Sequence, residues 1–491
     1  MKKRFLQIIS VLLLAACNQA PDTKTKTETT NATGVTTPDY QFVNGYPTEA
    51  TVQKAYDEAD LNRAIQCYRF FYPTVSILAT WDGNMAAGCV SNQTFAIMDG
   101  APAQVAFTPN SDTKYAGLPL DLSKGPIVLE VPPGPIMSVV NDMNQLYVMD
   151  IGMPGPDKGK GGKHIILPPG YKGTVPAGYY SGRSTTNKVL VLLRAIPLQG
   201  GAEAAEAMMK SIRLYPLGQS PLTVSWVNLN EKKADFTPVP NELGIGYWER
   251  LAKFINEEPF AEPYRAMYGE LAELGIEKGK SFNPDTRMKT ILEKAATTAN
   301  ALMRVQSFAD RRADKKVWKD RQWEWAVLRY ANGTFNTENY TDLYAREKWF
   351  YQAQIESPAM FNRAPGAGSL YWLGVKDNTG AYLDGGKTYK LTVPLPVPGK
   401  LFWSVTIYDN ATRSEIATDQ NKAALRSMFE LKGKTGTSID LYFGPTAPAG
   451  KEGVWIKTIP NKGWFSYFRI YGPEGPAFDG SWKPGDFEEV K

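Results

Sequence analysis

Residues 393–409 read VPLPVPGKLFWSVTIYD, and residues 131–142 read VPPGPIMSVVND. Each stretch contains a Pro-Gly pair, a short hydrophobic run, Ser-Val and then Asp, in the same order. Similarity between distant segments of one chain indicates two copies of one structural unit. Because turns made of Pro and Gly also match by chance, the duplication depends on further landmarks.

Two more pairs of segments follow in the same order. Residues 448–453 and 168–173 share the pattern P-x-G-x-x-G. Residues 461–469 and 187–194 both begin with Asn-Lys and run through largely apolar residues to an Arg. Several landmarks in one order favour a duplication over chance.

The repeated unit is predicted to consist of β-strands. Residues 401–408 and 463–471 are rich in Val, Ile, Phe, Trp and Tyr and are bounded by Pro and Gly, which is typical of strands. From about residue 95 to residue 198 the pattern is also that of short strands separated by Pro and Gly turns. We therefore predict a strand-rich unit over residues 93–200 and a second over residues 366–491.

The amino terminus has the features of an export signal. Lys2, Lys3 and Arg4 precede an apolar stretch over residues 5–14, which is too short to span a bilayer. The sequence LAAC that ends at Cys17 resembles the lipobox of bacterial lipoproteins. The alternative is a soluble secreted protein in which this cysteine is incidental.

The lipobox resemblance implies that residues 1–17 are a lipoprotein signal peptide and that Cys17 carries acyl chains, palmitate among them. Several chains hold a protein firmly on a lipid bilayer. Asn18 follows the cysteine, which points to the outer rather than the inner membrane of a bacterial cell envelope. Residues 18–39 are rich in Thr, Lys, Asn and Pro, and we predict that they form a disordered tether.

The composition excludes several classes of function. The chain has 55 Lys and Arg and 50 Asp and Glu, and removal of Lys2, Lys3 and Arg4 leaves 52 basic residues. A nearly neutral chain suggests no nucleic-acid partner. The single histidine, His164, excludes a histidine-based zinc site, and no G-x-S-x-G motif accompanies it.

His164 follows a glycine- and lysine-rich segment, residues 155–163. The spacing of a phosphate-binding loop, G-x-x-x-x-G-K-[ST], is not met, because His164 occupies the hydroxyl position. We therefore predict a mobile loop, and for His164 a structural place at the edge of a strand.

Residues 40–92 are predicted to be a helical amino-terminal segment. Helical spacing runs through residues 48–72 up to Pro73, and a second helix is predicted over residues 75–84. Cys67 and Cys89 could pair across a helical hairpin, or each could be a buried thiol. The sequence leaves both alternatives open.

Residues 201–365 are predicted to be a mainly helical connector. The sequence Asn-Pro-Asp at residues 283–285 is a strong helix start, and an apolar stripe follows it as far as Gln306. Further helices are predicted over residues 243–255, 260–274 and 315–330. The aromatic residues of the last segment have mixed helical spacing and are predicted to lie in the core.

Two groups of motifs resemble known families. Residues 109–115 (PNSDTKY), 120–126 (LDLSKGP) and 167–173 resemble the bacterial family called domain of unknown function 1254. From Tyr371 onward, the motifs FWSV at 402–405, DLYFGP at 440–445 and WKPGD at 482–486 are similar to its partner, domain of unknown function 1214.

The resemblance implies an α+β fold in which two related, jelly-roll-like β-sandwich subdomains accompany a helical amino-terminal segment and a helical middle segment. It implies no reaction. The loop over residues 156–163 is shorter and richer in lysine than the family pattern, which puts any ligand preference there in doubt.

A polar cluster precedes a predicted strand in the first unit. It consists of Asn110, Asp112, Thr113 and Tyr115. Loops on a rigid sandwich often carry binding groups, so Asp112 could act as a general base or anchor while Asn110 and Tyr115 orient a ligand. The simpler interpretation is a turn in which Asn110 and Asp112 cap their own backbone. Weaker candidates are Arg183, Arg194, Asp142, Asp409 and Asp419.

Three functions follow as hypotheses. The first is an envelope lipoprotein that binds a neutral or weakly polar ligand, small or oligomeric, between the two units. The second is a hydrolase of esters or glycosides that uses Asp112 or another carboxylate. The third is a structural or assembly component that forms a homo-oligomer. None of the three requires a cofactor or a metal.

Overall fold

The computed structural model describes residues 39–100, 102, 104–198, 201–230, 232–328, 334–366 and 368–490. The predicted signal peptide, Cys17 and the predicted tether up to residue 38 lie outside the described residues. The chain divides into two compact units, one up to Ala55 and one from Tyr56 onward.

The described part of the first unit begins with a small hairpin. Strands β1 (Phe42–Val43) and β2 (Tyr46–Pro47) pair antiparallel around Asn44 and Gly45. Both turn residues have positive φ, 53° and 84°, which an Asn-Gly turn between two strands favours. Helix α1 (Glu49–Ala86) starts directly after this hairpin.

Helix α1 continues through Pro73, so the predicted break into two helices is wrong. A proline inside a helix costs about 3 kcal/mol. Three neighbours, Phe71, Val75 and Ile77, are at most 1% exposed. Each buried side chain of this kind contributes about 1.5–3 kcal/mol, so their packing outweighs the proline.

The first sandwich consists of two sheets that share one hydrophobic core. Its six-stranded sheet has the order β12-β3-β4-β10-β6-β7, and its four-stranded sheet has the order β11-β5-β8-β9. The strands are β3 (Thr94–Met98), β4 (Tyr115–Asp121), β5 (Ile127–Val131), β6 (Ile136–Asp142), β7 (Tyr147–Gly152), β8 (Gly162–Leu167), β9 (Tyr179–Arg183), β10 (Lys188–Ala195), β11 (Arg213–Pro216) and β12 (Ser225–Asn228). Strands β11 and β12 fall in the segment predicted to be connector, residues 201–365, and each extends one of the two sheets.

The second sandwich has a five-stranded sheet, β13-β14-β20-β16-β17, and a four-stranded sheet, β19-β18-β15-β21. Its core is rich in aromatic residues. The strands are β13 (Glu324–Trp325), β14 (Ser369–Gly374), β15 (Tyr389–Pro394), β16 (Gly399–Asp409), β17 (Ala424–Arg426), β18 (Ser438–Gly444), β19 (Trp455–Lys457), β20 (Trp464–Pro473) and β21 (Phe487–Glu489).

The two sandwiches repeat one topology, strand by strand. In the larger sheets, β10 lies between β4 and β6, and β20 lies between β14 and β16. In the smaller sheets, β5 and β15 occupy the same place, and the pairs β8 with β9 and β18 with β19 are both parallel. The structure confirms an α+β fold with two related strand-rich subdomains.

The strand register aligns specific residues of the two copies. Arg194 pairs with Tyr115 and Met137, and Arg469 pairs with Tyr371 and Ser404. The Asp that ends each motif also keeps its place, five residues from the arginine row. The Ser-Val landmark is shifted by one residue, because Met137, not Ser138, occupies the position of Ser404.

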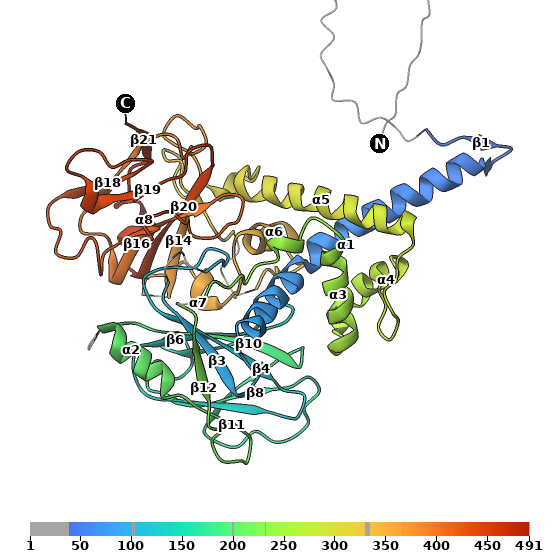
Figure 1. The fold of residues 1–491 in the computed structure, drawn as a ribbon, viewed down its shortest axis with the longest axis horizontal. Helices are drawn as coiled ribbons and strands as arrows, with labels where there is room; N and C mark the ends of the chain where they lie inside the picture. Colours follow the sequence, from blue (N-terminus) through green and yellow to red (C-terminus); the bar gives the residue numbers. More distant parts are fainter. Residues whose placement is uncertain are drawn as a thin grey trace, which may run out of the picture. The chain divides into compact units, whose positions relative to one another are not determined.

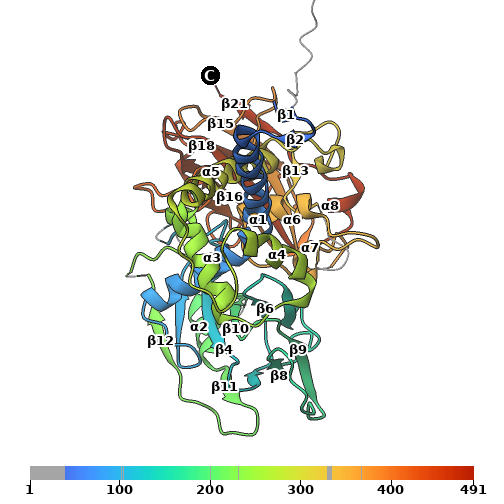
Figure 2. The same ribbon diagram turned by 90° about the vertical axis from the view of Figure 1, so that its right-hand side faces the viewer.

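The remaining helices are α2 (Gly201–Lys210), α3 (Ile245–Glu257), α4 (Arg265–Glu273), α5 (Thr286–Phe308), α6 (Leu343–Gln352), α7 (Pro358–Phe361) and α8 (Pro476–Asp479), and 3₁₀ turns cover Val239–Asn241, Glu262–Tyr264, Ala313–Lys315 and Glu452–Val454. Helices α3 to α7 of the middle segment pack with α1 around a third core. In Figures 1 and 2, α3 to α5 are the green to yellow ribbons beside the blue α1, and α6 and α7 are orange.

The helix predicted over residues 315–330 does not form in its described part. Residues 316 and 324 form an antiparallel bridge, and β13 joins the edge of the five-stranded sheet. Trp318 and Trp323 lie in the aromatic core, and the Trp323 indole donates to the carbonyl of Gly485 at 2.8 Å. Packing against this core overrides the helical pattern. None of the described helices is both long and apolar enough to cross a membrane.

Candidate ligand-binding cavity

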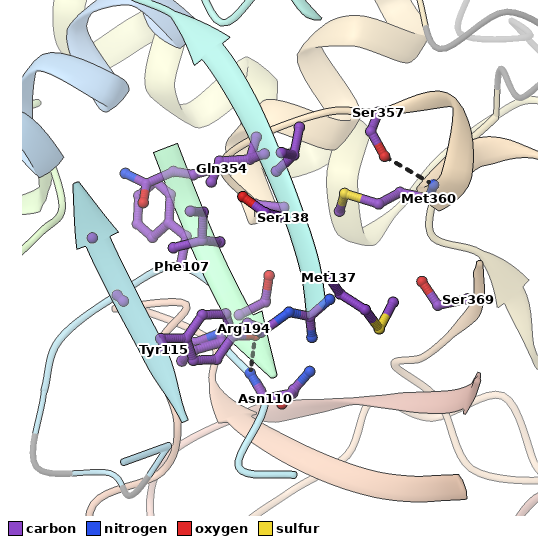
Figure 3. Close-up of a pocket in the computed structure, with 18 of the residues that line it drawn as sticks. Phe107, Asn110, Tyr115, Met137, Ser138, Arg194, Gln354, Ser357, Met360 and Ser369 are labelled. Carbon is purple, nitrogen blue, oxygen red and sulfur yellow. Dashed lines mark hydrogen bonds between the residues drawn. The ribbon is translucent and has the colours of Figure 1, made fainter. Parts of the chain in front are cut away.

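A cavity of about 150 Å³ lies between the larger sheets of the two sandwiches. Strands β4, β6, β7 and β10 of the first copy and β14 and β20 of the second contribute to its wall. The wall also contains residues of α1 and β3, residues 106–110, Leu229, Phe236 and the segment from Trp349 to Ser369. Figure 3 shows part of this lining. The cavity therefore lies where the repeated sheets face each other.

Most of the wall is apolar. Phe107, Leu190, Leu192, Ile355 and Met360 line it. Ser138 projects into the same space, is 4% exposed, and its hydroxyl has no hydrogen-bond partner. A buried hydroxyl without a partner is uncommon, and ligand or water commonly satisfies such a group.

One end of the cavity is polar and carries a cation, Arg194 (Figure 3). The guanidinium lies 5.3 Å from the ring centre of Tyr115 and 5.7 Å from that of Tyr471. Its Nη1 donates to the Tyr471 hydroxyl at 3.4 Å. The Asn110 backbone amide donates to the Tyr115 hydroxyl at 3.3 Å, and the Asn110 side chain donates to the Tyr471 hydroxyl.

The two phenol groups keep their protons at neutral pH. Burial raises the pKa of Tyr115 and of Tyr471 above the ordinary value of tyrosine. Both hydroxyls accept hydrogen bonds in the structure, and within the described part of the chain neither donates to an acceptor. Two hydroxyl protons beside Arg194 are therefore available to a ligand.

Arg469, the equivalent of Arg194 in the second copy, also lines the cavity. Its Nη2 donates to the carbonyl of Thr108 at 2.8 Å and to that of Pro109 at 3.4 Å, and its Nη1 donates to the Tyr408 hydroxyl. These bonds hold the segment that carries Asn110. Arg469 is thus used by the protein itself.

Asp150 is the acid among the described lining residues. It lies on β7 and is 4% exposed. Burial raises the pKa of Asp150 to about 7, although hydrogen bonds with the Ser357 side chain and the Ala359 backbone lower it in part. The wall of the cavity therefore changes charge near neutral pH.

Two protein-family models match the chain, one on each side of this cavity. Residues 92–216 match the family described as Protein of unknown function (DUF1254), and residues 368–475 match Protein of unknown function (DUF1214). The chain carries a DUF1254 domain followed by a DUF1214 domain. The matched segments contain strands β3–β11 and β14–β20, so the cavity lies between the two domains.

One solved structure shares the fold. The VPA0106 protein from Vibrio parahaemolyticus is 17% identical, with a TM-score of 0.54 over 88% of this chain and 100% of the other. A putative uncharacterized protein from Burkholderia cenocepacia is 11% identical, with a TM-score of 0.39 over 90% of this chain and 97% of the other. No curated protein matches the chain.

The predicted cluster in the DUF1254 domain is split between two cavities. Asn110 and Tyr115 line the cavity described above. Asp112 and Thr113 line a second one of about 650 Å³, whose wall also contains Arg426. Residues 111–113 form a bend before strand β4, and this bend directs the side chains of Asp112 and Thr113 away from those of Asn110 and Tyr115.

Asp112 is held by the DUF1214 domain. Its Oδ2 accepts from the Ser404 hydroxyl at 2.7 Å, while Oδ1 has no partner among the described residues. Burial raises the pKa of Asp112, and the nearby Arg469 and Arg426 lower it in part. The Asn110 side chain accepts from the Asp112 amide at 3.0 Å, so the predicted turn is present as well.

The two cysteines do not pair. Cys67 and Cys89 are free and buried, so the disulfide left open by the sequence is not formed. Helix α1 runs without a break from Cys67 to Ala86, and nineteen residues at 1.5 Å each place Ala86 about 28 Å along the helix from Cys67. Cys89 follows only three residues later. Burial raises the pKa of Cys67 to about 12 and that of Cys89 to about 11, so neither is a reactive thiolate.

His164 is fully buried in β8, which is an inner strand of its sheet and not an edge. Its Nε2 lies 3.2 Å from Asp157 Oδ1, and the same oxygen accepts from the Gly152 amide at 2.8 Å. His164 thus has a structural place, as predicted, but away from the strand edge. No group of three or more potential metal-ligating residues occurs in the described part of the chain.

The sequence patterns gave too little weight to three residues of the cavity wall: Arg194, Arg469 and Tyr471. Arg194 was only a weak candidate, although it and Arg469 end the matching Asn-Lys segments of the two copies. The matching Asn-Lys segments were the sequence feature that could have identified both arginines. Tyr471 follows Arg469 by two positions and carried no signal of its own.

Proposed function

We propose that the protein binds a small organic molecule in the cavity between its DUF1254 and DUF1214 domains. The single observation that carries this proposal is a mostly apolar cavity of about 150 Å³ that also contains the unpartnered hydroxyl of Ser138. A cavity of this size in an apolar core accommodates a molecule about as large as benzene. The volume favours a small ligand over an oligomeric one.

We also propose that acyl chains on Cys17 anchor the protein to a membrane. The sequence LAAC ending at Cys17 supports it, together with the basic and apolar stretches before it. Mass spectrometry of the mature protein tests it: the proposal expects an acylated Cys17, and an unmodified amino terminus would contradict it.

The hydrolase hypothesis has less support. Asp112 is 1% exposed and one of its oxygens is bound to Ser404, so as a base it would act from the second cavity, away from Asn110 and Tyr115. Turnover of esters or glycosides that is lost in Asp112→Asn would favour it.

Binding is tested by calorimetry and thermal shift with molecules of benzene size. The set contains neutral and ionised members, namely benzyl alcohol, benzamide, indole and benzoate. We expect at least one to bind with a saturable isotherm. The variant Leu192→Trp, which fills the cavity, should weaken that binding at least about 10-fold, while overpacking costs about 1–3 kcal/mol of stability.

The control is Leu222→Trp, because Leu222 is partly exposed and is not among the lining residues. It should bind like the wild type. Absence of binding by every member of the set, or equal binding by Leu192→Trp and wild type, would contradict the proposal.

A further inference from the structure

The internal repeat places two arginines at equivalent points of the cavity, and they differ in what they bind. Arg469 donates to the Tyr408 hydroxyl and to two carbonyls, so it is well satisfied. Arg194 makes one long hydrogen bond, at 3.4 Å, to the Tyr471 hydroxyl. The two copies therefore differ at this position. Arg469 binds groups of the protein itself, whereas most of the donors of Arg194 remain available to a ligand.

Arg194 forms no ion pair with a carboxylate of the described residues. Burial raises the pKa of Asp112, and the charge of Arg194 is among those that lower it in part, but the Asp112 carboxylate is bound to the Ser404 hydroxyl. Arginine cannot lose its proton in a protein. Arg194 is partly buried. A charge that is withdrawn from water is ordinarily paired, because the loss of hydration is costly. The guanidinium is therefore suited to an anion supplied from outside.

The neighbours of Arg194 also act as donors. Tyr115 and Tyr471 have hydroxyl protons that no acceptor among the described residues takes. An ionised carboxylate only accepts hydrogen bonds, and a guanidinium can bind both of its oxygens. A neutral amide or alcohol would bring a donor into a set of donors.

Asp150 is too distant to serve as the partner. Its strand β7 lies two strands from β10, and Asp150 pairs with Val139, which pairs with Leu192. With strands about 4.8 Å apart and residues about 3.3 Å apart, its Cα lies about 12 Å from that of Arg194. Asp150 hydrogen-bonds instead with Ser357 and the backbone of Ala359.

From these observations we infer that the ligand is an organic monocarboxylate with an apolar body of about benzene size, bound through its carboxylate to Arg194. This inference rests on the proposed function and narrows it. It differs from the sequence-based expectation of a neutral or weakly polar ligand, which stays a prediction. The carboxylate lies at the polar end with Asn110, and the apolar body lies against Phe107 and Leu192.

The test compares benzoate with its neutral isostere benzamide by calorimetry near neutral pH. We expect the wild type to bind benzoate at least about 10-fold more tightly, because hydrogen bonds to charged groups are the stronger ones. Arg194→Gln should remove this preference and change the affinity for benzamide less than about 3-fold. Arg194→Lys keeps the charge without the fork and should keep part of the preference.

The control is Arg183→Gln, because Arg183 is exposed and lies outside the cavity. It should keep the full preference. Equal affinity for benzoate and benzamide in the wild type would overturn the inference while leaving the cavity proposal intact. If neither binds, nor any other member of the set, the proposed function itself fails. Tighter binding of phenylphosphate than of benzoate would also overturn the assignment to carboxylates. The wild-type comparison decides the question even if the Arg194 variants do not fold.

Discussion

Asp150 stands out among single residues, because it is an acid buried in a mostly apolar wall. Its pKa of about 7 lies well above the value of about 3.9 in an unfolded chain. The folded state therefore holds a proton that the unfolded state releases. The contribution is fully present below pH 4 and is lost as the pH rises to about 7, by about 4 kcal/mol at most.

We predict that Asp150→Asn removes this loss. The variant should match the wild type near pH 4 and exceed its free energy of unfolding by about 2–4 kcal/mol at pH 8, as measured by urea unfolding. The control is Glu249→Gln at an exposed position, which should leave the free energy of unfolding unchanged at both pH 4 and pH 8. A difference between Asp150→Asn and wild type that does not change with pH would show that Asp150 is not the titrating group.

At the residue scale, part of the candidate site was predictable. Asn110 and Tyr115 were chosen from a dense polar motif, and both line the cavity. Asp112 came from the same motif but faces the other side of the segment. Sequence spacing shows which residues are close along the chain, whereas the face of each one is set by packing against Ser404 and its neighbours.

At the scale of elements, the loop over residues 155–163 is held by one buried acid. Asp157 accepts from the amides of Gly152 at 2.8 Å and Gly161 at 3.2 Å, and contacts His164. The mobility of this loop stays a prediction. Its lysines, Lys158 and Lys160, are exposed.

We predict that Asp157→Ala releases this loop. The lost acceptor leaves buried donors unsatisfied, at about 1–3 kcal/mol for each group. Trypsin should then cleave after Lys158 or Lys160 at least about 10-fold faster than in the wild type, as followed by mass spectrometry. Asp384→Ala, which removes an acceptor for Gly386 in another turn, should leave cleavage at these lysines unchanged. Equal cleavage rates in Asp157→Ala and wild type would refute the prediction.

The elements differed in how far sequence determined them. Helix α5 starts as predicted within two residues, since Asp285 accepts from the Met288 amide at 2.7 Å and thus caps it. The segment around Trp318 and Trp323 was expected to be helical, but its indoles pack into the second sandwich. Local signals decide capped helices, while aromatic residues follow the core that is available.

On the scale of the whole molecule, the duplication was the most predictable feature. The landmarks that end at Arg194 and Arg469 correspond to strands with the same neighbours and register. Turn and strand patterns recur in the sequence because each copy forms the same strands and the same turns between them. What could not be predicted is how the copies meet, since that depends on contacts between residues hundreds of positions apart.

One such contact joins four segments of the chain at a buried ion pair. Arg413 of the DUF1214 domain is fully buried and donates to both oxygens of Glu242 in the middle segment, at 2.7 and 2.9 Å. It also donates to Tyr72 of α1 at 3.2 Å and lies between the rings of Phe107 and Tyr351. Helix, connector and both domains therefore converge on one guanidinium.

We predict that Arg413→Met lowers the free energy of unfolding by about 3–5 kcal/mol, because Glu242 is left buried without its partner. The double variant Arg413→Met with Glu242→Leu removes both charges, so it should recover most of that loss, and replacing a buried pair by apolar groups is often neutral. Urea unfolding of the wild type, both single variants and the double variant gives the coupling energy directly. A double variant whose loss equals the sum of the two single losses would mean that the pair is not coupled and that the segments are held together by apolar packing alone.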